Sequence, residues 1–348
     1  MRQAMVRQEW AESQLEGMLS SLQDTGALGV SGWARFSADK RPAAQNPETF
    51  WFMQKVDHTG LNDTLFKQRI YINTNEYIAG GPIYIFNSGE TPASPSYLYG
   101  GQPFQLAKET GGMLVIMEHR YYGKSYPVSD MSGASMKYLT VENSLDDIAN
   151  FIRNAPAFIR DNTGVAIPPS SKWVATGGSY SAMLAAWARM MYPELIHAAY
   201  ASSAPVLAEI DFYQYDQVVG EALPCASKIA DAIETLDQIL DSKNRTLIDS
   251  WKRASGLDQV QDDIDFAGAF IDQMSNVVQY YVPPASGSNA PDSITSLCSW
   301  FGRQQYIPLQ NLADMTSAYI RSNSIDTVSA YSSQVGAGNT NLGQDGRA

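Results

Sequence analysis

The segment Trp173–Met183, WVATGGSYSAM, limits most strongly what this chain can fold into. A short apolar run ends at two glycines, a serine follows, and residues that favour a helix come next, which is typical of a strand, a tight turn and a helix. The pattern fits the G-x-S-x-G nucleophile elbow with serine in the last place. Residues two before and two after the central serine face backbone in such a turn and must be small. The predicted elbow therefore comprises Gly177, Gly178, Ser179 and Ser181.

Ser179 is the candidate catalytic nucleophile of this elbow. A serine that precedes a helix lies in the positive field of the helix N-terminus, as does the N–H of Tyr180. That field favours an alkoxide-like oxygen and a developing oxyanion, so we expect the Tyr180 N–H to be one donor of an oxyanion hole. In the alternative, the serine only caps the helix. The pentapeptide alone leaves both open, whereas the strand before it and the helix after it favour the nucleophile.

The second oxyanion donor is expected in the loop Asn87–Thr91, NSGET, which follows another apolar run. In elbow-containing hydrolases this donor is a backbone N–H of a loop beside the nucleophile strand. We predict the N–H of Gly89 or of Glu90, and an ordinary glycine turn is the alternative.

Short apolar runs alternate with helical patterns between residues 49 and 207. Runs without strong alternation are expected of strands buried on both faces, and strands that alternate with helices indicate a mostly parallel sheet. We therefore predict an α/β core of the α/β-hydrolase type. The expected strands are 68–73, 82–87, 113–118, 173–176 and 197–202, and the expected helices are 141–159 and 179–191.

Helical patterns without a further buried strand fill residues 208–330, so a helical insertion or cap domain is predicted there. Its expected helices are 226–242, 257–280 and 308–321, with a loop at 283–293. The two ends have a different composition. Residues 1–48 are expected to form an amphipathic helix over 8–22 and an extended arm, and residues 331–348 a disordered tail.

Charge and composition narrow the function classes. A net charge of −12 over 348 residues argues against nucleic acid and anionic membrane as partners. The N-terminus as written has no signal-peptide pattern. Cys225 and Cys298 lack the spacing of metal ligands, so no metal or cofactor is expected, and whether they form a disulfide or stay two thiols is open. The sequons at Asn62 and Asn244 predict glycosylation if the chain is exported.

Four segments in order resemble one peptidase family. They are Gln54–His58 with Thr64–Arg69, Phe86–Glu90, Glu118–Ser125 (EHRYYGKS) with Leu139–Glu142, and Trp173–Val206. Together they resemble the serine peptidases that include lysosomal Pro-Xaa carboxypeptidase, dipeptidyl peptidase II, thymus-specific serine protease and fungal acid prolyl endopeptidases. Residues 208–300 look like the start of the helical insertion of that family. Ser181-Ala182 replaces the Gly-Gly that usually follows Ser-Tyr there.

The resemblance implies a serine peptidase that hydrolyses peptide bonds next to proline through an acyl-enzyme, with Ser179 as nucleophile. It implies a secreted, lysosomal or vacuolar protein that works at acid pH without a metal. Its partner is a proline-containing peptide or protein, and a homodimer is possible. The family triad runs Ser, Asp, His along the chain, with the insertion between Ser and Asp.

No histidine of this chain suits the triad. His58 lies far upstream, and His197 opens a strand and therefore lies at the opposite sheet edge from Ser179. His119 lies at the same edge, but the usual strand order puts one strand between them, a gap of about 10 Å. We therefore expect His119 to be structural, beside Arg120.

The triad Asp and His have no match in residues 301–348, so we expect a chain truncated inside the insertion, with the last part of the core missing and little or no peptidase activity. The rivals are a non-catalytic peptide-binding protein and an α/β-hydrolase esterase. The acidic residues after Ser179 are expected to form a solvated surface: Asp211, Asp216, Asp262, Asp263 and Asp265.

Overall fold

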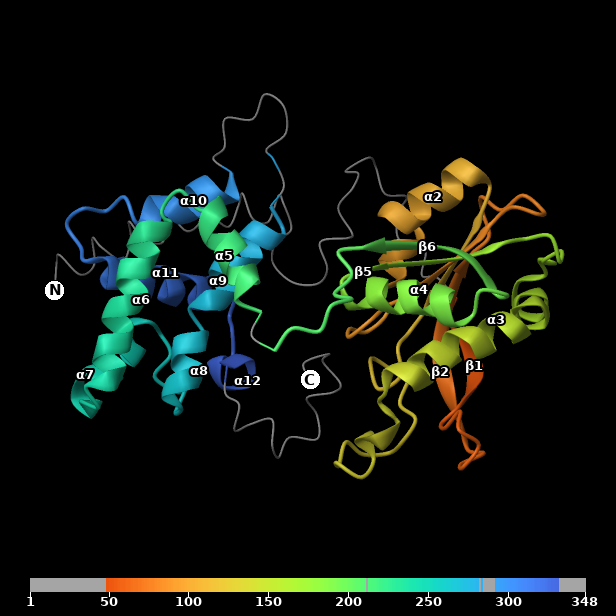
Figure 1. The fold of residues 1–348 in the computed structure, drawn as a ribbon, viewed down its shortest axis with the longest axis horizontal. Coiled ribbons are helices and arrows are strands. Elements are labelled where there is room, and N and C mark those ends of the chain that lie inside the picture. Colours follow the sequence, from red (N-terminus) through yellow and green to blue (C-terminus); the bar gives the residue numbers. More distant parts are fainter. Residues whose placement is uncertain (1–47, 211, 282, 284–291, 332–348) are drawn as a thin grey trace. The chain divides into compact units, whose positions relative to one another are not determined.

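The computed structural model describes residues 48–331, apart from 211, 282 and 284–291 (Figure 1). The helix expected over 8–22, the arm that follows it and the tail after residue 331 lie outside the described residues. The described chain divides between Ala208 and Glu209 into two compact units. We name them the sheet unit (residues 48–208) and the helical unit (residues 209–331), and each has a hydrophobic core of its own.

The sheet unit contains a six-stranded mixed sheet in the order β1-β2-β4-β3-β5-β6. β4, β3, β5 and β6 run parallel, and β1 and β2 are antiparallel additions at one edge. This order, with the helix after β5, confirms the prediction of an α/β sheet of the α/β-hydrolase type. The strands are β1 Phe50–Lys55, β2 Leu65–Asn73, β3 Ile83–Asn87, β4 Met113–Met117, β5 Trp173–Gly178 and β6 Ile196–Ser202.

Helices cover both faces of the sheet (Figure 1). Successive strand residues point to opposite faces. Ile83 and Ile85 of β3 therefore pack with α3 (Val141–Thr163) and α4 (Tyr180–Met191), whereas Tyr84 and Phe86 pack with η2 (Pro95–Leu98) and α2 (Gln102–Thr110). Every residue of β3 and β4 is buried. This two-sided burial is why their sequences are continuous apolar runs.

β1 is a strand that apolar periodicity alone did not reveal. Buried and exposed residues alternate strictly along it, but two of its exposed residues are apolar: Trp51 and Met53, which are 41% and 48% exposed. The apolar residues on both faces hide the alternation. Helix α3 continues four residues beyond the expected end at Ile159, to Thr163, where Gly164 ends it in the left-handed conformation.

A fully buried arginine ties the segments around the sheet together. All five N–H donors of Arg120, just after β4, have acceptors. Nε and Nη2 contact the two carboxylate oxygens of Asp147 in α3 at 2.8 and 2.6 Å. The other donors reach the carbonyl oxygens of Lys55, Val56 and Tyr138 at 3.0–3.1 Å. Since every donor is satisfied, the charge is tolerated inside the unit.

Glu118, two residues before Arg120, organises the neighbouring loop. Its carboxylate is fully buried and accepts from the backbone N–H groups of Ala93 and Lys124 at 2.9 and 2.8 Å. It also accepts from the hydroxyl of Ser125 and pairs with Arg69 of β2. The segment EHRYYGKS, which carries much of the resemblance, is therefore a set of buried polar anchors.

The helical unit contains no strand among its described residues. Its helices are α5 Tyr213–Ala222, α6 Ala226–Asp241, α7 Arg245–Ala254, α8 Asp263–Gly268, α9 Ile271–Gln279, α10 Ser293–Trp300, α11 Pro308–Ser322 and α12 Thr327–Tyr331. The predictions of helices over 226–242 and 308–321 are confirmed by α6 and α11. The others were not recognised as separate helices from the sequence.

The prediction of one helix over 257–280 is wrong. The Asp262 carboxylate accepts from the N–H groups two and three residues later, at 2.7 and 3.2 Å, and so begins α8. The residues before it form a loop that places Leu257 and Val260 fully inside the core. The ammonium of Lys252 binds the carbonyl oxygen of Val260 at 2.9 Å and holds this loop.

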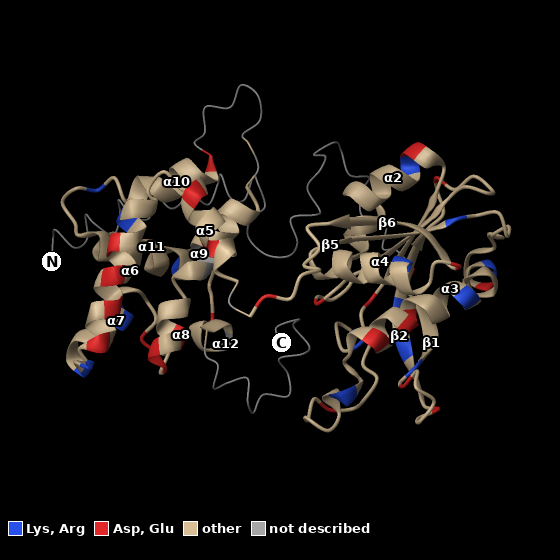
Figure 2. Cartoon of the chain, in the orientation of Figure 1, with Lys and Arg blue, Asp and Glu red and all other residues tan. Residues whose placement is uncertain are grey.

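The acidic surface expected on this unit is only partly solvated. In Figure 2 the positions of Asp and Glu are red along α6, α7 and α8. Asp216 is exposed, whereas Asp262, Asp263 and Asp265 are half-buried. Asp263 pairs with two cations, and these contacts lower the pKa of its carboxyl against the opposing effect of burial, the largest single contribution. Asp211 lies outside the described residues.

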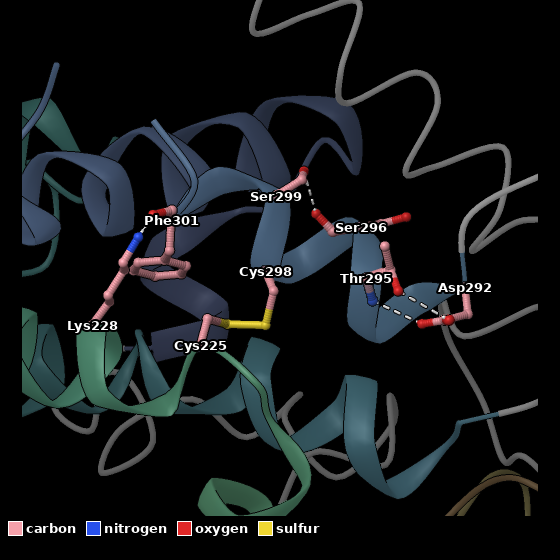
Figure 3. Close-up of a disulfide and its surroundings, with 8 residues drawn as sticks. All are labelled: Cys225, Lys228, Asp292, Thr295, Ser296, Cys298, Ser299 and Phe301. Carbon is pink, nitrogen blue, oxygen red and sulfur yellow. Dashed lines mark hydrogen bonds between the residues drawn. A yellow bond between two sulfur atoms is a disulfide. The ribbon is translucent and has the colours of Figure 1, made fainter. Parts of the chain in front are cut away.

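Cys225 and Cys298 form a disulfide, which the sequence left open (Figure 3). The bond joins the start of α6 to α10 across a sequence separation of 73 residues. Beside it, Lys228 of α6 donates to the carbonyl oxygen of Phe301, just after α10, at 2.7 Å. Two independent contacts therefore hold these helices together.

The buried Arg120–Asp147 pair yields a stability prediction. Arg120→Met should lower the free energy of unfolding by about 3–5 kcal/mol, because it leaves the Asp147 charge buried without its partner. The matched control is Arg160→Met, since Arg160 and Asp161 form an ion pair in which both side chains are more than 60% exposed. That change should cost less than about 1 kcal/mol. Urea unfolding followed by tryptophan fluorescence measures both, and equal losses would contradict the assignment.

Candidate active site

Ser179 lies in a strained turn between β5 and α4. Its backbone angles are φ 55° and ψ −128°, a conformation that residues other than glycine rarely adopt. The turn is held from both sides. The Ser179 N–H donates to the carbonyl oxygen of Ser202 on β6 at 3.0 Å, and its own carbonyl accepts from Ala182 and Met183 of α4. In this turn Ser179 is exposed at the carboxyl end of the sheet.

The flanking residues show why the turn needs small side chains. A Cβ on Gly177 would lie 2.3 Å from the carbonyl carbon and oxygen of Ser181. Ser181 is buried, and its hydroxyl donates to the carbonyl oxygen of Asn87 at the end of β3. A serine is therefore accepted where glycine is usual, because its hydroxyl has an acceptor. Gly178 completes β5 opposite Ser202.

The loop predicted to supply the second oxyanion donor packs against the elbow. Gly89 has φ +67°, and a Cβ there would lie 3.5 Å from the Ser181 Cβ and 3.7 Å from the Tyr180 ring. The N–H of Gly89 donates to the side-chain oxygen of Asn87 at 3.0 Å, so this donor is already engaged. The N–H of Glu90 has no acceptor within the described residues. Glu90 itself is exposed.

Tyr180 is bound through its side chain to a buried histidine. The phenol oxygen lies 3.0 Å from Nε2 of His119, and the rings are 5.5 Å apart. Nδ1 of His119 lies 2.7 Å from the carbonyl oxygen of Arg120, which can only accept, so Nδ1 carries the proton. Burial lowers the pKa of His119 to about 4. The neutral ring therefore presents Nε2 as an acceptor for the Tyr180 hydroxyl.

The Tyr180 phenol is itself kept protonated. Burial raises its pKa to about 12, and the nearby charge of Glu90 adds to the effect. The hydroxyl oxygen of Ser144 in α3 lies 3.0 Å from Nε2 of His119 and 2.9 Å from the carbonyl oxygen of Thr140, and its one proton can go to either acceptor. The first residue of α4 is thus anchored to α3 and to the loop after β4.

None of the three histidines contacts Ser179. His119 follows β4, and β3 lies between β4 and β5 as the strand order predicted. His197 begins β6, whereas Ser179 lies beside the last residue of that strand. His58 contacts the Asp147 carboxylate through Nε2 at 2.7 Å. The expectation that His119 is structural is confirmed by its two hydrogen-bonded nitrogens.

Two contributors to the site were missed from the sequence. Asn87 binds both the Gly89 N–H and, through its carbonyl, the Ser181 hydroxyl. The asparagine two residues before a glycine is a local turn signal that could have indicated the first of these contacts. Ser144 belongs to a helix far along the chain, and no local signal connects it with His119.

This chain resembles known proteins over most of its length. The profile described as "Serine carboxypeptidase S28" matches residues 54–342. The chain belongs to this family. The putative serine protease K12H4.7 of Caenorhabditis elegans is 31% identical to it over 294 residues, covering 79% of this chain and 56% of that protein.

Other relatives agree with the family assignment. The thymus-specific serine protease of Mus musculus is 28% identical over 295 residues, covering 79% of this chain and 56% of the relative. The probable extracellular serine carboxypeptidase of Arthroderma benhamiae is 34% identical over 211 residues, covering 59% and 29%. The chain thus spans about half the length, or less, of these relatives.

Among the described residues, every helix is too short or too polar to span a membrane. The same residues contain no group of three or more His, Cys, Asp or Glu side chains placed to hold a metal ion.

The elbow geometry predicts an asymmetric response to two Gly→Ala substitutions. Gly177→Ala should lower the free energy of unfolding by about 1–3 kcal/mol or more, because the new methyl group meets backbone that cannot move aside cheaply. Gly133→Ala is the matched control in the same unit, since a Cβ there meets nothing within 4 Å. Urea unfolding of both variants measures the difference, and an unperturbed Gly177→Ala protein would refute the packing argument.

The burial of neutral His119 predicts a pH dependence of stability. The unfolded chain takes up a proton near pH 6.5, whereas folded His119 does so near pH 4. The unfolded state therefore binds more protons between these values, and stability falls by about 3 kcal/mol as the pH falls through this window. His119→Gln should remove that component from the urea midpoints measured between pH 7 and 4. His197→Gln, at an exposed site, should keep it, and a pH slope unchanged by His119→Gln would contradict the assignment.

Proposed function

We propose that Ser179 is the nucleophile of a serine peptidase that hydrolyses peptide bonds next to proline. The exposed, strained Ser179 at the β5–α4 turn, in a chain of the S28 family, carries this proposal. The serine oxygen attacks the carbonyl carbon after proline, and the amine leaves with a proton. Water then hydrolyses the resulting ester and frees the serine. Proline preference follows from the sequence resemblance.

The oxyanion of the tetrahedral intermediate would be bound by two backbone N–H groups. The first is that of Tyr180, which has no acceptor within its own helix because it is the first helical residue. The second is that of Glu90, because the Gly89 N–H is held by the Asn87 side chain. The His119–Tyr180 hydrogen bond supports this arrangement by fixing the side chain of the residue that carries the first donor.

The general base and its acidic partner are proposed to lie in the part of the relatives' length that this chain does not span. The chain has three histidines, and each is placed away from Ser179. Without an imidazole beside Ser179, residues 1–348 alone would retain only the catalysis that comes from binding and the oxyanion donors. This polypeptide is therefore expected to be a slow enzyme.

The missing imidazole also supports a second candidate function. A chain that keeps the elbow but has no base beside it could bind proline-containing peptides without cleaving them. The two functions differ in turnover and share peptide binding.

Export from the cell is part of the proposal. The Cys225–Cys298 disulfide is typical of oxidising compartments. The relative from Arthroderma benhamiae is described as extracellular. A secreted or lysosomal protein is therefore favoured.

Hydrolysis of a fluorogenic proline peptide tests the proposal on two polypeptides, residues 1–348 and the product of the complete transcript. In 1–348, Ser179→Ala should change the weak turnover less than about tenfold, because a serine without its base contributes little more than no serine. Where a triad is complete, Ser179→Ala should lower kcat by on the order of 10⁶-fold. Ser203→Ala is the control, since Ser203 also has a positive φ and is exposed near the same sheet edge.

The outcomes separate the candidates. Rapid cleavage by 1–348 that Ser179→Ala abolishes would show that a base lies within these residues. Peptide binding without turnover in both polypeptides would favour the binding protein. Cleavage of acyl esters with no cleavage of the proline peptide would overturn the peptidase proposal.

A further inference from the structure

The turn between α6 and α7 presents an asparagine that the proposed peptidase chemistry does not use. Asn244 and Thr246 form the sequon Asn-Arg-Thr, and both are exposed. The side-chain oxygen of Asn244 accepts from the N–H of Leu247 at 3.2 Å and so caps α7. Its backbone N–H donates to the hydroxyl of Ser242 at 3.2 Å. The amide nitrogen Nδ2 has no acceptor among the described residues.

We propose that Asn244 carries an N-linked glycan. The proposal rests on the proposed export, since the modification occurs in the secretory pathway. In the reaction, Nδ2 attacks the anomeric carbon of an oligosaccharide carried on a lipid diphosphate. The N–C bond forms, the C–O bond to the diphosphate breaks, and Nδ2 loses one proton. The product keeps the side-chain oxygen, so the cap on Leu247 survives the modification.

The second sequon of the chain provides an internal comparison. Asn62 lies between β1 and β2 and is half-buried. Its Nδ2 donates to the hydroxyl of Tyr138 at 3.1 Å, and its side-chain oxygen accepts from the N–H of Thr64 at 2.9 Å. A glycan on Nδ2 of Asn62 would have to extend past Tyr138, whereas a glycan on Nδ2 of Asn244 extends into solvent. The structure therefore assigns the modification to Asn244.

The folded turn has room for a glycan at Asn244. Asn244 and Thr246 are both exposed, and nothing described in the structure covers Nδ2.

The experiment expresses residues 1–348 behind a secretion leader in a eukaryotic host and treats the secreted protein with peptide N-glycosidase. The wild type should show one enzyme-sensitive mass step, and peptide mapping in heavy-oxygen water should place the label at position 244. Asn244→Asp removes the sequon but keeps a good helix cap, so it should lose the step without loss of stability. Thr246→Ala should also lose it, and Thr246→Ser should keep it. Asn62→Asp is the matched control and should keep the step.

The controls separate failure of the glycan from failure of export. Thiol alkylation of the same secreted sample reports whether Cys225 and Cys298 are bonded. Secreted, disulfide-bonded wild type without an enzyme-sensitive step would overturn the proposal. A single step that persists in Asn244→Asp, or that only Asn62→Asp removes, would overturn it as well. Two steps, of which Asn244→Asp removes one, would uphold the glycan at Asn244 and overturn the choice of Asn244 over Asn62.

Discussion

The buried pair of Arg120 and Asp147 is the contact on which the rest of the sheet unit depends. A guanidinium inside a protein is tolerated only when its donors are satisfied, and here all five are. Those acceptors come from the end of β1, the 3₁₀ turn before α3, and α3 itself. Arg120, a single residue in the loop after β4, therefore fixes where α3 lies against the sheet. Because α3 packs against α4, the same pair also supports the helix that begins at Tyr180.

The nucleophile elbow lies between β5 and α4 and holds Ser179 in an exposed position. Its strain is balanced by contacts on both neighbouring strands. Ser202 on β6 accepts from the Ser179 N–H, and Asn87 at the end of β3 accepts from the Ser181 hydroxyl. The two parallel neighbours of β5 thus hold the turn from either side. The result is an exposed serine at the carboxyl edge of the sheet, directly before the first residue of α4, as our proposal for Ser179 requires.

The sequence was informative where burial is two-sided and where local chemistry decides. The apolar runs of β3, β4 and β5 were recognisable because both faces of these strands are buried. The need for a small residue at Gly177 was recognisable because backbone lies where its side chain would be. Apolar periodicity did not reveal strand β1, because Trp51 and Met53 lie on its outward face. The 257–280 segment was misjudged because its apolar residues serve a buried loop as well as two helices. Arg120 and Asp147 could not be paired from sequence, since partners far apart in the chain leave no local pattern. The two cysteines allow one pairing, and the sequence left open whether that bond forms.

His119 lies at the same sheet edge as Ser179, but it acts as a hydrogen-bond acceptor for Tyr180 and not as a general base. A general base for Ser179 must exchange a proton near the working pH and must reach the serine oxygen. His119 does neither, because its two nitrogens are engaged and its pKa of about 4 keeps it neutral. The burial that lowers the pKa of His119 prevents it from acting as a base, and it also keeps Nε2 available as an acceptor for the Tyr180 hydroxyl. Its bond to Tyr180 keeps the same donor and acceptor from neutral pH down to about 4. The oxyanion donor that we assign to Tyr180 would therefore stay in place in an acidic compartment, where an exposed histidine would already have gained a proton and lost its acceptor.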